Sequence, residues 1–162
     1  FKFSFWGDII GRITTKLSDL GHKRIVFTAK CGGIQPHFIP NKQLITGSKT
    51  YIEGQLLTWD NMFSNCKDTY LAHGVHFTSP SPVYETSELL TYLGNFDFVD
   101  SEIGHFAKSA HKSGMSFGYL HFISNNLTKI YNEDLSNERM ESVLQKREQV
   151  MKNIQSLLYQ VV

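Results

Sequence analysis

The sequence predicts an α/β fold in which a central sheet is flanked by helices, and two observations support this. Short apolar runs rich in β-branched and aromatic residues alternate with amphipathic segments of helical period, a pattern typical of sheets covered by helices. The chain has 162 residues, of which 41% are hydrophobic and 13% aromatic, which is enough to bury a continuous core. We therefore expect a single domain over residues 1–162.

The first half of the chain predicts one helix followed by strands. The expected elements are a helix over 8–20, a strand over 24–28, and further strand or hairpin segments over 43–47 and 49–52. After the first strand we expect an exit loop over 29–33, where Gly32 and Gly33 permit a tight turn or close approach of the backbone to a ligand. The segment 54–70 is mixed and predicts no particular element.

The second half continues the alternation of strand and helix. The expected elements are strands over 74–78, 96–100 and 115–123, helices after Thr86 and over 103–110, and a long terminal helix over 135–161. Thr86 is a good N-cap for the helix that follows it. In the terminal segment the helical spacing of apolar residues is interrupted by Arg147.

Charge and composition exclude several classes of partner. Sixteen Lys and Arg against fifteen Asp and Glu leave a net charge of +1, and the charges are interspersed, so we expect no nucleic acid and no anionic membrane as a partner. The apolar start is broken at Gly7 and Asp8, far short of a membrane span, and lacks the features of a signal peptide. Because the chain does not begin with Met, we expect it to belong to a longer or processed protein.

The cysteines and histidines suggest neither a disulfide framework nor a metal site. Cys31 and Cys66 show no paired Cys/His spacing, so we expect free thiols and a cytoplasmic, reducing compartment. The seven histidines form no HExxH motif, and the sequence contains no Gly-x-Ser-x-Gly or Walker motif. No metal and no cofactor are therefore predicted.

Three polar segments each follow an apolar strand: 82–86, 99–102 and 123–126. Ligands of open α/β sheets bind outside the carboxyl ends of the strands. Residues delivered there by three strands can converge on one small molecule, so these segments predict a small-molecule site.

Together with residues 30–33, the three segments resemble the purine nucleoside phosphorylase and nucleosidase superfamily, from about residue 21 to residue 126. Residues 74–86 resemble the family strand that leads to Gly-Pro-x-Phe/Tyr-Glu-Thr, with Ser81 in place of a glycine. Residues 99–102 resemble Val-Asp/Glu-Met-Glu, and residues 123–125 resemble Ile-Ser/Thr-Asp/Asn. The resemblance implies a phosphorylase-like fold with a mixed central sheet, cleavage of the N-glycosidic bond of a purine nucleoside, and a homo-oligomer.

Glu102 and Asn125 are the predicted catalytic residues. An ionised Glu102 would accept hydrogen bonds from both ribose hydroxyls, and bonds of this charge-assisted kind are strong. Asn125 would donate a hydrogen bond to a purine ring nitrogen and stabilise the negative charge that develops on the departing base. The alternatives are a first-turn helix carboxylate for Glu102 and a turn-capping residue for Asn125.

Four further residues are predicted to bind substrate by resemblance to the family. Tyr84 would stack on the base, and Glu85 would accept a hydrogen bond from a purine ring N–H. His76 would bond a ribose hydroxyl, and Ser101 stands where a methionine usually packs beneath the sugar. The alternatives are a core Tyr84, a first-turn Glu85 and a structural His76.

The segment containing Lys30, Gly32 and Gly33 is the candidate phosphate site. Glycine-lined turns bind anions through backbone N–H groups, and Lys30 would either supply charge to a phosphate or fill the pocket and exclude it. Inorganic phosphate is therefore a candidate co-substrate, and the sequence leaves phosphorolysis and hydrolysis open. Phe27 stands where some members have Arg, and the usual amino-terminal phosphate loop is absent. These departures support the alternative of a non-catalytic nucleoside-binding or scaffold domain within a larger protein.

Overall fold

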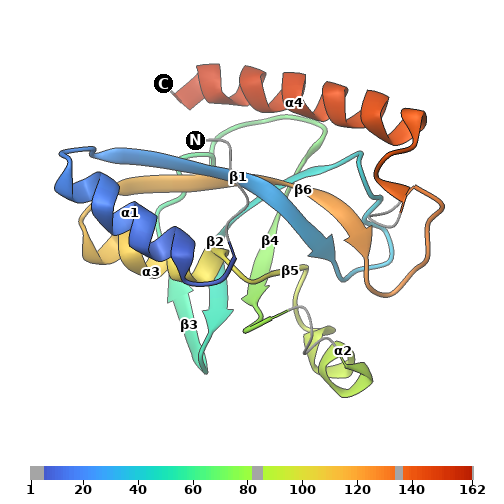
Figure 1. Cartoon of the computed structure of the whole chain (residues 1–162), viewed down its shortest axis with the longest axis horizontal. Coiled ribbons are helices and arrows are strands. Elements are labelled where there is room, and N and C mark those ends of the chain that lie inside the picture. Colours follow the sequence, from blue (N-terminus) through green and yellow to red (C-terminus); the bar gives the residue numbers. More distant parts are fainter. Residues whose placement is uncertain (1–5, 82–85, 134–136, 162) are drawn as a thin grey trace.

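The computed structural model describes residues 6–81, 86–133 and 137–161, whose helices and strands are drawn in Figure 1. In chain order the elements are α1 (Ile9–Asp19), β1 (Arg24–Gly33), β2 (Leu44–Ile52), β3 (Gln55–Thr58), β4 (Leu71–Thr78), α2 (Ser87–Leu93), β5 (Phe98–Asp100), α3 (Ile103–Lys112), β6 (Ser116–Asn126) and α4 (Glu141–Val161). The predicted alternation of helices and strands is confirmed.

The strands form one mixed sheet that curls back on itself. Their order is β3-β2-β4-β5-β1-β6, and β2 also pairs with β6. The pairs β1–β6, β2–β4 and β4–β5 are parallel, whereas β1–β5, β2–β3 and β2–β6 are antiparallel. The mixed sheet agrees with the prediction, but its closure through β2 and β6 was not predicted from the sequence.

Helices cover both sides of the curled sheet (Figure 1). On one side, α1 and α3 bury Ile10 and Phe106 against strand residues such as Phe117. On the other side, α4 buries apolar residues such as Ile154 and Leu157. The short helix α2 packs Leu93 against a third, smaller cluster beside the ends of β4 and β5.

Several element boundaries differ from the predictions. Residues 29–33 are not an exit loop, because β1 continues to Gly33 and pairs with both β5 and β6. Residues 44–52 form one strand with an irregularity between Thr46 and Lys49. The hairpin lies after this strand, where β2 turns into its antiparallel partner β3. The terminal helix begins at Glu141 rather than at 135.

The helix α3 lies unusually close to the sheet at Gly104. A Cβ atom at this position would lie 2.6 Å from Cδ1 of Ile52 and 2.8 Å from Oγ1 of Thr78. Only glycine allows this approach without a shift of the neighbouring groups. The close contact fixes the start of α3, and with it the residues that precede the helix.

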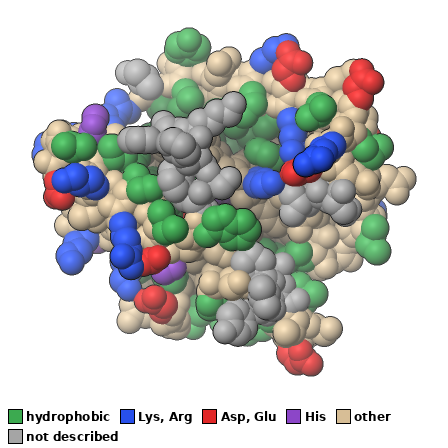
Figure 2. All heavy atoms as spheres, viewed as in Figure 1, with side chains coloured by type: hydrophobic (Ala, Val, Ile, Leu, Met, Phe, Trp, Pro, Cys, Tyr) green, Lys and Arg blue, Asp and Glu red, His purple; other side chains and the backbone are tan. Residues whose placement is uncertain are grey.

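Charged side chains of both signs are mixed on the surface. On the face drawn in Figure 2, Lys and Arg side chains lie among Asp, Glu and hydrophobic side chains. In the part of the chain that the structure describes, no helix combines the length and the apolar character needed to cross a membrane. Both cysteines are free, with Cys31 buried and Cys66 half-buried.

Candidate functional site

The end of β1 lies between the segments that carry Glu102 and Asn125. Gly32 of β1 pairs with Val99 of β5 on one side and with Asn125 of β6 on the other. The expectation of three carboxyl ends at one sheet edge is only partly met, because β5 is antiparallel to β1. The residues gather instead around the last residues of β1, because β5 and β6 both pair with them.

Glu102 follows β5 directly and occupies the N-cap position of α3. Its Oε1 accepts a hydrogen bond from the backbone N–H of Gly7 at 3.3 Å, and its Oε2 accepts one from the N–H of Ser101 at 3.1 Å. Burial raises the pKa of this carboxyl, and the two N–H groups oppose the rise. The carboxylate is thus held in a fixed place, half-buried beside the start of the helix.

The side chain of Asp100 caps the N-terminus of α3. Oδ1 of Asp100 accepts hydrogen bonds from the backbone N–H groups of Glu102 at 3.3 Å and Ile103 at 3.2 Å. Glu102 makes no side-chain cap of its own. Sequence reasoning missed this role of Asp100, although an Asp just before a helix is a known capping signal.

Asn125 and Asn126 have different surroundings. Oδ1 of Asn125 lies 3.0 Å from the hydroxyl of Ser124, which can donate to it. Within the described part of the chain, Nδ2 of Asn125 donates no hydrogen bond. Asn126 instead organises the turns, since its Nδ2 donates to the carbonyl oxygens of Gln35 and Phe38. The turn-capping alternative therefore applies to Asn126 and leaves the amide of Asn125 free to donate.

His76 and Ser101, both predicted to bind the sugar, are buried. The ring of His76 is fully enclosed, and its Nδ1 lies 3.1 Å from the hydroxyl of Tyr119. Ser101 contributes its backbone N–H to Glu102. The structure therefore places His76 inside the protein, which agrees with the structural alternative.

The candidate phosphate residues make other contacts. Nζ of Lys30 lies 3.2 Å from Oε2 of Glu138 in an exposed ion pair. Gly32 and Gly33 belong to a paired strand, where a Cβ would lie 3.1 Å from Val99 and 3.0 Å from Phe38, respectively. These glycines therefore serve close packing, and the predicted anion-binding loop does not form from them.

Two predicted base-binding residues, Tyr84 and Glu85, lie outside the described residues. The prediction for the helix after them is confirmed, since Oγ1 of Thr86 accepts a hydrogen bond from the N–H of Leu89 at the start of α2.

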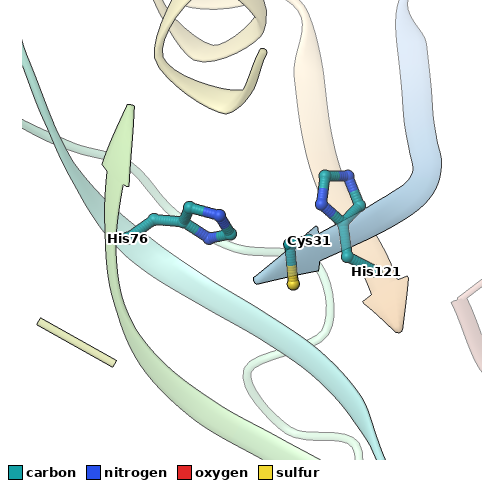
Figure 3. A group of neighbouring side chains, drawn as sticks. All are labelled: Cys31, His76 and His121. Carbon is teal, nitrogen blue, oxygen red and sulfur yellow. The ribbon is translucent and has the colours of Figure 1, made fainter. Parts of the chain in front are cut away.

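Sequence reasoning also missed a buried polar cluster beneath the strand ends (Figure 3). Cys31, His76 and His121 come from β1, β4 and β6, and each offers a ligand atom within 4.8 Å of the others. The carboxylate of Asp100 lies 3.5 Å from a ring nitrogen of each histidine. These residues are far apart in the sequence, so no local spacing could have revealed the cluster.

Burial shifts the pKa values of this cluster toward neutral side chains. It lowers the pKa of His121 to about 3 and holds that of His76 well below its usual range. It raises the pKa values of Asp100 and Cys31, and nearby carboxylates add to both rises. All four shifts favour the uncharged form of the side chain.

Comparisons with known proteins identify the fold. No protein-family model matches the chain, and no curated protein matches it. Solved structures do match. One of them is an MTAN mutant from Helicobacter pylori with 5′-methylthioadenosine in the active site. Its TM-score is 0.72 at 16% identity, and the match covers 98% of this chain and 78% of that one. The fold is that of the purine nucleoside phosphorylase and nucleosidase superfamily, as the sequence motifs predict.

Two further structures show the breadth of the similarity. The S-adenosylhomocysteine nucleosidase of Streptococcus pyogenes, in complex with 5-methylthiotubericidin, has a TM-score of 0.69 at 14% identity, over 98% of this chain and 78% of that one. Isoform 2 of purine nucleoside phosphorylase from Schistosoma mansoni, in complex with cytosine and ribose-1-phosphate, has a TM-score of 0.65 at 16% identity, over 96% of this chain and 66% of that one. The chain thus resembles both nucleosidases and phosphorylases.

Proposed function

We propose that this chain cleaves the N-glycosidic bond of a purine nucleoside and releases the free base. The observation that carries the proposal is that β5, which leads to Glu102, and Asn125 of β6 lie on the two sides of the end of β1, with the Nδ2 group of Asn125 free to donate. The similar solved structures named above are of nucleosidases and a phosphorylase, which supports the same reaction.

The two residues would act on opposite ends of the scissile bond. As the bond breaks, negative charge develops on the base, and a hydrogen bond from Asn125 to a ring nitrogen stabilises it. Glu102 would accept hydrogen bonds from the ribose hydroxyls, because each carboxylate oxygen keeps a second lone pair beside the bonds from Gly7 and Ser101. Tyr84 and Glu85 remain the proposed contacts to the base.

Of the two candidate nucleophiles, water is favoured over inorganic phosphate. The ammonium group of Lys30 already pairs with Glu138, and Gly32 and Gly33 are engaged in sheet pairing. Neither feature provides the anion site that phosphorolysis needs. Phosphate as a co-substrate is the alternative, and the assay must distinguish it from hydrolysis by water.

The test is base release from a panel of purine nucleosides, with and without phosphate, followed by chromatography. We expect release that does not depend on phosphate. Because loss of one transition-state donor costs about 2.7–4 kcal/mol, Asn125→Ala is expected to slow turnover roughly a hundred- to a thousand-fold, and Glu102→Gln to slow it as well. The matched controls, Asn65→Ala and Glu141→Gln, change exposed residues and are expected to keep the wild-type rate.

Unchanged turnover in both Glu102→Gln and Asn125→Ala would contradict the proposed roles. A rate that rises in proportion to phosphate would replace hydrolysis by phosphorolysis.

A second candidate function is a non-catalytic nucleoside-binding domain. It is favoured by the surroundings of Glu102. Both carboxylate oxygens already accept hydrogen bonds from backbone N–H groups, so the side chain already has partners without a substrate. This candidate predicts saturable binding of a nucleoside by calorimetry with no free base formed.

We also propose that the protein is a single-domain homo-oligomer of the cytoplasm that acts in purine metabolism. The two free cysteines support a reducing compartment. Ile130 is 93% exposed and Tyr159 is 87% exposed, and burial of such side chains between chains would stabilise an oligomer. Light scattering after size-exclusion chromatography measures the number of chains directly.

A further inference from the structure

The polar cluster beneath the strand ends has the composition of a metal site. One thiol and two imidazoles, from Cys31, His76 and His121, come from three strands (Figure 3), and one ligand atom from each lies within 4.8 Å of the others. Their exposed fractions are 4% for Cys31 and 0% for both histidines. Sulfur and imidazole nitrogen are ligands that Zn²⁺ prefers.

The ring nitrogens of this cluster have unused hydrogen-bonding capacity. Among the described residues, Nε2 of His76 and both nitrogens of His121 are buried and have no hydrogen-bond partner. Leaving such atoms unpaired in the core costs free energy. A bound ion would use the lone pairs that the surrounding protein does not.

The Nδ1 atom of His76 has the kind of hydrogen-bond partner that metal-binding histidines usually have. Its Nδ1 lies 3.1 Å from the hydroxyl of Tyr119, which can accept a hydrogen bond from Nδ1–H and so direct the lone pair of Nε2 into the cluster. Histidines that bind metals usually donate their other N–H to such a partner, which fixes tautomer and ring orientation.

Asp100 completes the set of ligands. Its Oδ1 lies 3.5 Å from Nε2 of His76, and its Oδ2 lies 3.5 Å from Nδ1 of His121. Backbone N–H groups of Glu102 and Ile103 hold the carboxylate in this place.

We propose that Cys31, His76, His121 and Asp100 bind one zinc ion that joins β1, β4, β6 and β5. A thiolate and a carboxylate together balance the charge of Zn²⁺, so the buried site is neutral when filled. With bonds of about 2.0–2.3 Å, the ligand atoms of a tetrahedral zinc site lie about 3.3–3.7 Å apart. The 3.5 Å separations of Asp100 agree with this spacing, and the wider limit of 4.8 Å requires small side-chain rotations.

Four protein ligands and complete burial define a structural role. Such a site leaves no coordination position for water or substrate, unlike a catalytic zinc site. The ion would therefore stabilise the folded chain without taking part in the proposed reaction, and its presence can be measured on the resting protein without substrate.

The first test measures the metal content and spectrum of the full chain. Purified from zinc-supplemented medium, it is expected to contain about one zinc per chain. After chelation and addition of Co²⁺, a near-ultraviolet charge-transfer band would report the bond between cobalt and the thiolate of Cys31. With zinc at a hundred times its dissociation constant, the midpoint of thermal unfolding is expected to rise by roughly 5–10 °C.

Matched cysteine variants locate the ion. Cys31→Ser is expected to lose the charge-transfer band, whereas Cys66→Ser, which changes the half-buried cysteine outside the cluster, is expected to keep it. If Cys31→Ser binds as much zinc as the wild type, the ion lies elsewhere, at exposed histidines for example, and the proposal fails. A folded wild-type chain without the cobalt–thiolate band also overturns it, and this measurement requires no variant.

Discussion

At the residue scale, one buried hydroxyl joins three elements next to the site. Oγ1 of Thr78, at the end of β4, accepts a hydrogen bond from the N–H of Gly104 in α3 at 2.8 Å. It also lies 3.0 Å from Oγ1 of Thr50 in β2. Both partners are buried, so water cannot replace the hydroxyl, and the start of α3 depends on this contact.

Replacing Thr78 by Val keeps the shape of the side chain and removes the hydroxyl. The N–H of Gly104 and the hydroxyl of Thr50 then lose a buried partner, so the free energy of unfolding is expected to fall by about 1–3 kcal/mol. Urea denaturation measures the change. The control Thr58→Val, at an exposed position of β3, is expected to stay within about 0.5 kcal/mol of wild type, and equal losses in the two variants would contradict the assignment.

At the element scale, Arg147 explains why the apolar pattern of α4 is interrupted. Its Nε donates a hydrogen bond to Oδ1 of Asn41 at 2.9 Å, and its Nη1 lies 3.3 Å from Oε2 of Glu138. The guanidinium also lies 5.5 Å from the ring centroid of Phe122 on β6. The residue that breaks the pattern is therefore one that attaches the helix to the sheet.

Arg147→Ala is expected to weaken the attachment of α4. Since hydrogen bonds of charged groups contribute about 1.5–3 kcal/mol, we expect a loss of that order in the free energy of unfolding. Lys152→Ala is the control on the same helix, because Lys152 is 62% exposed and pairs only with Glu148 among the described residues. Chemical denaturation of both variants measures the loss. Identical denaturation midpoints would show that Arg147 does not stabilise the packing of α4 on the sheet.

At the scale of the whole molecule, the pairing of β2 with β6 encloses the polar cluster. Leu44 and Ile45 of β2 pair with Phe122 and His121 of β6, so Cys31 cannot reach solvent unless the sheet opens. Cys66 lies outside this enclosure and is half-buried.

The two cysteines are therefore expected to react with a thiol reagent at very different rates. With metal removed by a chelator, Cys66 is expected to be modified in the native protein. Cys31 is expected to react more slowly by about four or more orders of magnitude, because its exposure requires opening against a stability of about 5–15 kcal/mol. Mass spectrometry of timed samples follows both sites, and comparable rates would show that the sheet does not close as described.

The sequence allowed the prediction of most elements because they depend on local signals. The periodicity of α1, the Thr86 cap and the strand at β4 are readable within a few residues. The end of β1 was mistaken for a loop because Gly32 and Gly33 are favourable in turns, and only the pairing with β5 and β6 makes them a strand.

The candidate site could be predicted in part for the same reason. The motifs containing Glu102 and Asn125 are contiguous, so resemblance to a family could find them. The capping by Asp100 and the cluster of Cys31 with His76 and His121 arise from strand pairing. Contacts between residues distant in sequence leave no periodicity or spacing that a single sequence can show.

The parallel pairing of β1 with β6 also has a consequence during synthesis of the chain. β1 begins at Arg24, and its partner begins at Ser116, so β1 leaves the ribosome long before that partner exists. At roughly 5–20 residues per second this interval lasts several seconds, during which an apolar strand remains without its neighbour. Until β6 has been made, the edge of β1 that pairs with it is open to pairing with other chains, which favours aggregation.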